Sequence, residues 1–188
     1  MSQIKKEMRP ELFKTVTKLA LTPHFLDVYN FQIACEKLIP LEEGYVKDPD
    51  DLGGETKYGI SKRSYPHLDI KNLTLADARI IYYQDFWEEL PTYFMGVDGS
   101  SLMMNLSANM GVPQAIKLLQ AALGMTGKEL DGIAGPATRK LLVEFYYDNR
   151  DDELISKIKE KASEFYVSLA EKNPSQKKFL NGWLNRLK

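Results

Sequence analysis

Residues 41–61 have the sequence LEEGYVKDPDDLGGETKYGIS. In most of the chain the hydrophobic residues recur with the spacing of an α-helix, and this segment breaks that pattern. Pro49 and the glycine pair at 53–54 disfavour a continuous helix across this segment. Only residues 57–61 favour strands, as a short β-hairpin. The segment therefore predicts a polar, glycine-rich connection with one small hairpin between helical parts of the chain.

Helices are expected on both sides of this connection. Thr74 with Asp77 forms a capping-box pattern, and Pro113 and Pro136 are suited to the first turn of a helix. We expect residues 96–101 to form a turn or linker. The fold class predicted is mainly α. The expected helices cover approximately residues 11–20, 23–38, 74–90, 113–123, 136–145, 153–171 and 179–187.

The bulk composition excludes several classes of protein. The 188 residues are 44% hydrophobic and 27% charged with a formal net charge of −1, so the basic stripe typical of a nucleic-acid-binding protein is not expected. No apolar run is long enough to insert into a membrane. The single cysteine, Cys35, excludes a disulfide framework and is predicted to be a buried structural thiol. We expect a monomer.

The acidic residues of the connection suggest glycosidase chemistry. Cleavage of a glycosidic bond needs one protonated carboxyl group and usually one ionised carboxylate. Glu42 follows the apolar Ile39-Pro40-Leu41, and an apolar wall would keep its proton in place. Asp51 or Asp50, in the polar loop, would stay ionised. From chemistry alone a solvated acidic loop remains the simpler reading, whereas the spacing fails the EF-hand calcium pattern.

A family resemblance favours catalysis. Residues 41–61 closely resemble the motif of glycoside hydrolase family 108, the N-acetylmuramidases that include phage endolysins and secretion-type muramidases. The resemblance implies that Glu42 is the catalytic acid and that the domain is lysozyme-like, with a hairpin near the active site. Glu43 stands where the family has glycine, which leaves either glutamate as the acid. The matching residues are Glu42, Gly44, Tyr45, Val46, Asp48, Pro49, Asp51, Gly53, Gly54, Thr56, Tyr58, Gly59 and Ile60.

A looser resemblance to phage-type lysozymes adds two catalytic candidates. Those enzymes space Glu, Asp and Thr across a short hairpin, and Glu42, Asp51 and Thr56 have nearly that spacing here, with the Thr about one residue early. There the Asp and Thr hold the attacking water, which suggests inversion at the sugar carbon. Tyr45 and Tyr58 are the residues expected to shape the sugar subsites.

The second half of the chain resembles a peptidoglycan-binding domain often joined to this hydrolase family. The run Asp131-Gly132-Ile133-Ala134-Gly135-Pro136, followed by Thr138, carries most of that resemblance. It implies that Asp131 and Thr138 could contact peptidoglycan, although the same residues could serve only a turn and a helix start. The expected domains are residues 1–98, with an N-terminal extension and the muramidase, and residues 99–188, the helical peptidoglycan-binding part.

These resemblances predict a lysozyme that hydrolyses the β-1,4 bond between N-acetylmuramic acid and N-acetylglucosamine, with peptidoglycan glycan strands as partner and no cofactor. The alternatives are a lytic transglycosylase and a non-catalytic wall-binding or virion protein. Residues 1–10 do not resemble a signal peptide. We therefore expect synthesis in the cytoplasm and action in the periplasm or cell wall after release by a holin or secretion system.

Overall fold

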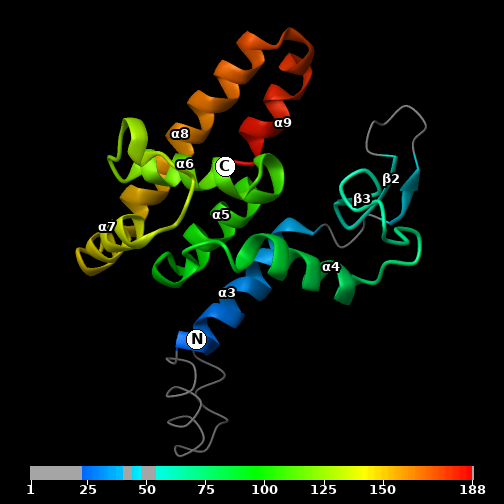
Figure 1. Cartoon of the computed structure of the whole chain (residues 1–188), viewed down its shortest axis with the longest axis horizontal. Coiled ribbons are helices and arrows are strands. Elements are labelled where there is room, and N and C mark those ends of the chain that lie inside the picture. The colour runs from blue at the N-terminus through cyan, green and yellow to red at the C-terminus, as the bar shows by residue number, and fades with distance from the viewer. Residues whose placement is uncertain (1–22, 40–43, 48–53, 188) are drawn as a thin grey trace, which may run out of the picture.

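A computed structural model describes residues 23–39, 44–47 and 54–187 and confirms a mainly helical fold with a small antiparallel sheet (Figure 1). The helix expected at residues 11–20 lies outside the described residues. The helices are α3 Pro23–Leu38, α4 Leu75–Tyr82, α5 Gly96–Met110, α6 Val112–Ala122, α7 Pro136–Tyr147, α8 Asp151–Lys172 and α9 Leu180–Asn185; the strands are β1 Val46–Lys47, β2 Glu55–Lys57 and β3 Ile60–Ser61. Short 3-10 or π turns cover Tyr83–Trp87, Thr92–Phe94, Gly127–Glu129 and Pro174–Phe179.

The central helix is α5, which packs against α3, α6 and α8. The expectation of a turn or linker at residues 96–101 was wrong, because these residues form the first turns of α5. A glycine in the first turn lets α8 approach: a Cβ on Gly99 would lie 3.0 Å from the Met95 Cβ, just before α5, and 3.8 Å from Cγ1 of Ile155 in α8. The hydroxyl of Ser100 donates to the carbonyl of Thr92 and that of Ser101 to the carbonyl of Val97. Their polarity is therefore satisfied internally, and the helix can be buried despite its polar sequence.

The hydrophobic core joins α3 to the α4–α5 region. Cys35 is 1% exposed, which confirms its predicted burial, and burial raises the pKa of its thiol to about 11, against a weaker lowering by Arg79. The thiol therefore stays protonated and unreactive near neutral pH. Phe31 meets Trp87 edge-on at 5.3 Å, and the Trp87 indole N–H donates to Asp27.

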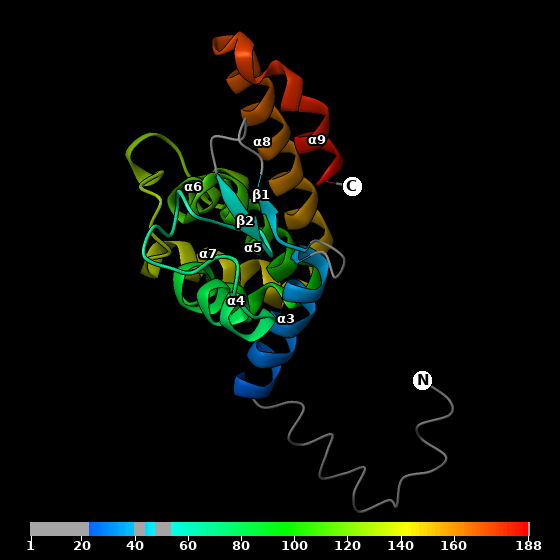
Figure 2. The same ribbon diagram turned by 90° about the vertical axis from the view of Figure 1, so that its right-hand side faces the viewer.

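The sheet has the order β1-β2-β3, with both pairs antiparallel. The β2–β3 hairpin confirms the strands expected at residues 57–61, and β1 adds a third strand that was not expected. The pairs of this register are Val46 with Thr56, Lys47 with Glu55, Thr56 with Ser61 and Lys57 with Ile60. Figure 1 shows the sheet and α7 on opposite sides of the molecule, and Figure 2 views it from the side of the sheet.

The helix starts follow the predicted local signals. Thr74 caps α4, and both halves of its capping box with Asp77 are formed. Pro113 lies in the first turn of α6 and Pro136 begins α7. The expected domain boundary at 98/99 falls inside α5, which runs continuously to Met110. No helix in the described parts of the chain is long and apolar enough to span a bilayer.

Candidate active site

The hairpin turn between β2 and β3 is held tightly against α4. Tyr58 and Gly59 both have positive φ, 52° and 76°, as a two-residue turn of type I′ requires. The hydroxyl of Tyr82 donates to the carbonyl of Tyr58 at 3.1 Å, and a Cβ on Gly59 would lie 2.5 Å from that hydroxyl oxygen. Ile60, the next residue, is 2% exposed in the core. The turn is therefore fixed by backbone geometry, a hydrogen bond and burial together.

Thr56, predicted to hold the attacking water, lies in the middle strand and is partly exposed. It is the cross-strand partner of Ser61, so the two side chains project from the same face of the sheet. Ser61 and Ser64 share a hydroxyl hydrogen bond of 3.0 Å, whereas none of the described residues accepts from or donates to the Thr56 hydroxyl. A positioned hydroxyl is thereby left available to a water or a sugar.

Tyr45 and Glu55 meet beside the sheet. The pKa of the Tyr45 hydroxyl is raised, first by partial burial. A hydrogen bond to the Glu55 carboxylate and the negative charges of Glu55 and Asp69 raise it further. The Tyr45 ring also packs on the core. An anchored aromatic ring of this kind is suited to lining a sugar subsite, as predicted for Tyr45.

The Tyr58 ring has two supports. It packs partly buried against the core, and the ammonium of Lys57 lies 5.5 Å from its centroid. The same ammonium donates to the carbonyl of Lys71 at 2.9 Å, which ties the following loop to the sheet. The role of Tyr58 in sugar binding stays a prediction.

The carboxyl groups central to the predicted chemistry lie outside the described residues: Glu42, Glu43, Asp50 and Asp51. Their described neighbours in the chain are Ile39, which is 2% exposed, and the β1 and β2 strands. In the described ranges, no group of three or more His, Cys, Asp or Glu side chains could hold a metal ion.

The Asp131–Thr138 region is organised around Gln120. The Gln120 side-chain amide donates to Asp131 Oδ1 at 2.7 Å, to the carbonyl of Ile133 at 3.1 Å and to Thr138 Oγ1 at 3.2 Å, and it accepts from the Gly132 N–H at 3.0 Å. Gln120 and Thr138 are each 1% exposed. These bonds give Thr138 a structural role. A direct contact between peptidoglycan and Asp131 or Thr138 stays a prediction.

The backbone of the same loop approaches α6 closely. Gly132 has φ +79°, and a Cβ there would lie 2.8 Å from the carbonyl oxygen of Pro113. The hydrogen bond from Gln120, then the N–H of Ile133, hold the pKa of Asp131 below its usual range. The loop is therefore built to be rigid.

The role of Gln120 was not predicted from the sequence. A signal for it was present: it is a polar residue four positions after Ile116 and three before Leu123, within the buried face of α6. Such a residue must find internal partners.

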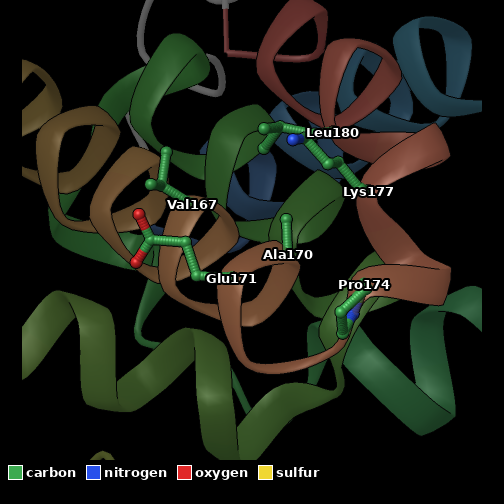
Figure 3. A pocket seen from close by; sticks show the side chains of 6 residues that line it. All are labelled: Val167, Ala170, Glu171, Pro174, Lys177 and Leu180. Carbon is green, nitrogen blue, oxygen red and sulfur yellow. The ribbon is translucent and has the colours of Figure 1, made fainter.

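Two pockets lie along α8. One, of about 310 Å³, is lined by Val167, Ala170, Glu171, Pro174, Lys177 and Leu180, between α8 and the C-terminal turns (Figure 3). The other, of about 470 Å³, lies where α3 and α5 meet α8 and the residues after α9. This second pocket joins the two halves of the chain. Trp183, in α9, stacks on Tyr166 at 5.2 Å and so packs within the helices.

The comparisons with known proteins agree with this architecture. The family model described as Glycosyl hydrolase 108 matches residues 35–111, and the model described as Predicted Peptidoglycan domain matches residues 114–188. Brucella abortus SagA has a similar solved structure, with a TM-score of 0.65, 20% identity, and coverage of 86% of this chain and 88% of that one. No curated protein matches.

The matched Glycosyl hydrolase 108 domain makes the protein a glycoside hydrolase. More particularly, the chain carries a glycosyl hydrolase 108 domain followed by a peptidoglycan domain, and its substrate is peptidoglycan. The two matches meet between residues 111 and 114, at the junction of α5 and α6. Gly111, with φ +86°, forms that junction.

Proposed function

We propose that the protein is an N-acetylmuramidase, which hydrolyses the β-1,4 bond from N-acetylmuramic acid to N-acetylglucosamine. The observation that carries the proposal is the hairpin, which presents the Thr56 hydroxyl within a hydrolase domain that also contains Glu42 and Asp51. Thr56 is partly exposed and has no partner among the described residues, which is the state required of a residue that orients a water.

In this mechanism Glu42 gives its proton to the bridging oxygen as the bond from the sugar carbon to that oxygen breaks. Positive charge develops on the sugar ring, and the ionised carboxylate of Asp51 stabilises it. Asp51 and Thr56 orient a water, which attacks the sugar carbon and loses its proton to the carboxylate. Attack from the face opposite the leaving group inverts the anomeric configuration, which NMR of the first product formed would detect.

The decisive experiment compares three proteins on purified peptidoglycan: wild type, Glu42→Gln, and Glu43→Gln as the matched control. Mass spectrometry of the released ends should find reducing N-acetylmuramic acid with wild type and Glu43→Gln. Loss of a general acid should slow Glu42→Gln by about 10²–10⁴-fold. Anhydro ends would instead indicate a lytic transglycosylase, and wall binding without soluble product would indicate a non-catalytic protein. Activity lost only in Glu43→Gln would reassign the acid.

As the biological setting we propose a phage endolysin, made in the cytoplasm and released to the wall by a holin. A short hydrolase joined to a peptidoglycan domain supports this role. Expression in a bacterial host with and without a holin tests it: lysis should require the holin. Lysis that instead requires a secretion machine would favour the secretion-type muramidases.

A further inference from the structure

The pocket of about 470 Å³ lies between the two domains and has an unusual set of side chains. Its lining comes from α3 and α5 of the hydrolase domain and from α8 and the end of the peptidoglycan domain. The charged members are Lys37, Asp98, Asp152, Lys159 and Arg186, and the others are Ser101, Leu102, Asn105, Ile155 and Leu187. The pocket therefore brings charged side chains of the two domains together.

One of the two carboxylates is already neutralised. The Lys37 ammonium lies 2.9 Å from Asp98 Oδ1, across from α3 to the first turn of α5. In contrast, the Arg186 guanidinium makes no ion pair or side-chain hydrogen bond with the residues that the structure describes, although the Arg186 N–H joins the backbone of α9. Arg186 therefore presents a charged fork of donors to the pocket.

Arg186 also acts electrostatically on two buried tyrosines of the core. Its positive charge lowers the pKa of the Tyr82 and Tyr166 hydroxyls, although burial dominates and raises both to about 12. The Tyr82 hydroxyl is the group that donates to the carbonyl of Tyr58 in the hairpin turn. The charge of a residue in the C-terminal domain therefore acts on the tyrosine that holds the hairpin of the hydrolase domain.

We propose that Arg186 binds a carboxylate of the peptidoglycan strand while its glycan occupies the hydrolase domain. The proposal rests on the proposed function and deepens it, because it names a substrate group and its binding site. A guanidinium matches a carboxylate with two parallel hydrogen bonds. Leu102, Ile155 and Leu187 supply apolar surface for the methyl groups of a short peptide.

Peptidoglycan offers this carboxylate from two sources. A stem peptide carries carboxylates along and at the end of its chain, and N-acetylmuramic acid has a lactyl carboxylate that is free only when the peptide is absent. The pocket, at about 470 Å³, has room for part of a peptide, and its apolar side would be unused by a lactyl group. Strands with and without peptides therefore separate the two sources.

The test measures binding in a Glu42→Gln background, so that no turnover is needed. Calorimetry would compare the parent, Arg186→Gln, Arg186→Lys and Lys177→Gln on soluble peptide-bearing strands. Lys177 is a matched control, because it is an exposed cation of the same domain that lines the other pocket. Arg186→Gln should raise the dissociation constant about tenfold, Arg186→Lys by less, and Lys177→Gln by under twofold.

Unchanged binding in both Arg186 variants would overturn the proposal, as would a larger loss in Lys177→Gln than in Arg186→Gln. If peptide-free strands show the same Arg186 dependence, the lactyl carboxylate is the ligand group; if the dependence disappears, it is the stem peptide. Arg186 is exposed, so thermal melting should match the parent. A failure of the muramidase proposal would appear separately, as the absence of reducing ends from wild type.

Discussion

The hairpin at residues 55–61 and the loop at residues 126–138 both depend on glycines with positive φ, yet they use their polar groups in opposite ways. In the hairpin, Gly59 fixes the turn and the Thr56 hydroxyl has no partner among the described residues. In the loop, Gly132 fixes the turn, and Gln120 and Thr138 are buried with their polar atoms bonded to one another.

This difference separates a functional role from a structural one. A buried polar group with internal partners stabilises the fold but cannot reach a ligand without breaking those bonds. A positioned hydroxyl without a hydrogen-bond partner adds little to stability and is free to bind water or substrate. The comparison predicts that damage to the loop lowers stability, whereas damage to the hairpin face lowers activity.

The largest effect is expected from Gln120→Met, which keeps the volume but removes the amide. It leaves Asp131, the Gly132 N–H and Thr138 without their shared partner. Each buried unsatisfied group costs about 1–3 kcal/mol, so the free energy of unfolding should fall by about 2–4 kcal/mol. Chemical denaturation measures this, and kcat should be unchanged at temperatures where the variant is folded.

Gln114→Met is the control, since Gln114 lies on the same helix and is only partly buried. Its unfolding free energy should change by less than about 0.5 kcal/mol. Equal effects of the two variants would show that the Gln120 network does not stabilise the loop.

The next effect in size is that of Thr56→Val. Valine keeps the shape and the strand preference of threonine but lacks the hydroxyl. We expect kcat on peptidoglycan to fall about 10- to 100-fold, as for loss of a group that orients a reactant, with a melting temperature close to that of wild type. Initial rates of reducing-end release provide the measurement.

Thr56→Ser restores the hydroxyl and should recover most of the activity. If Thr56→Val keeps full activity, Thr56 does not orient the water. The hairpin hydroxyl would then have no functional role to set against the structural role of the loop.

The smallest effect is expected from Asp131→Asn, and it should be detected only as a change in the pH dependence of stability. The pKa of Asp131 is lowered in the folded state, first by the Gln120 amide and then by the N–H of Ile133. Its contribution to stability is therefore fully present above the unfolded pKa of about 3.9 and is lost as pH falls through the lower folded value. Denaturation midpoints of wild type and Asp131→Asn should converge as pH falls from about 6 to 3. A constant gap would contradict this linkage.

Local signals in the sequence were enough to predict much of the fold. The helix predicted at residues 23–38 matches α3 in its bounds, and the Thr74–Asp77 capping box forms as expected. In each case the interactions that specify the element lie within a few residues of one another.

The wrong prediction for residues 96–101 has a physical cause. These residues resemble a linker because glycine and serine disfavour an isolated helix. Their small size favours a helix only when the helix packs against α3 and α8. The assignment of Thr56, Tyr45 and Tyr58 came from family resemblance, and the structure adds how the sheet and α4 hold them.

By itself, the sequence determined the starts of α4, α6 and α7, the position of the hairpin, the two-domain order and the hydrolase motif around Glu42, because each depends on neighbouring residues or on a continuous pattern. Only the tertiary structure decided that α5 is the buried centre, that Gln120 satisfies a loop up to 18 residues away, and that Arg186 lines a pocket with residues of α3 and α5. These features depend on contacts between segments far apart in the chain, and such contacts form only when the whole core is packed.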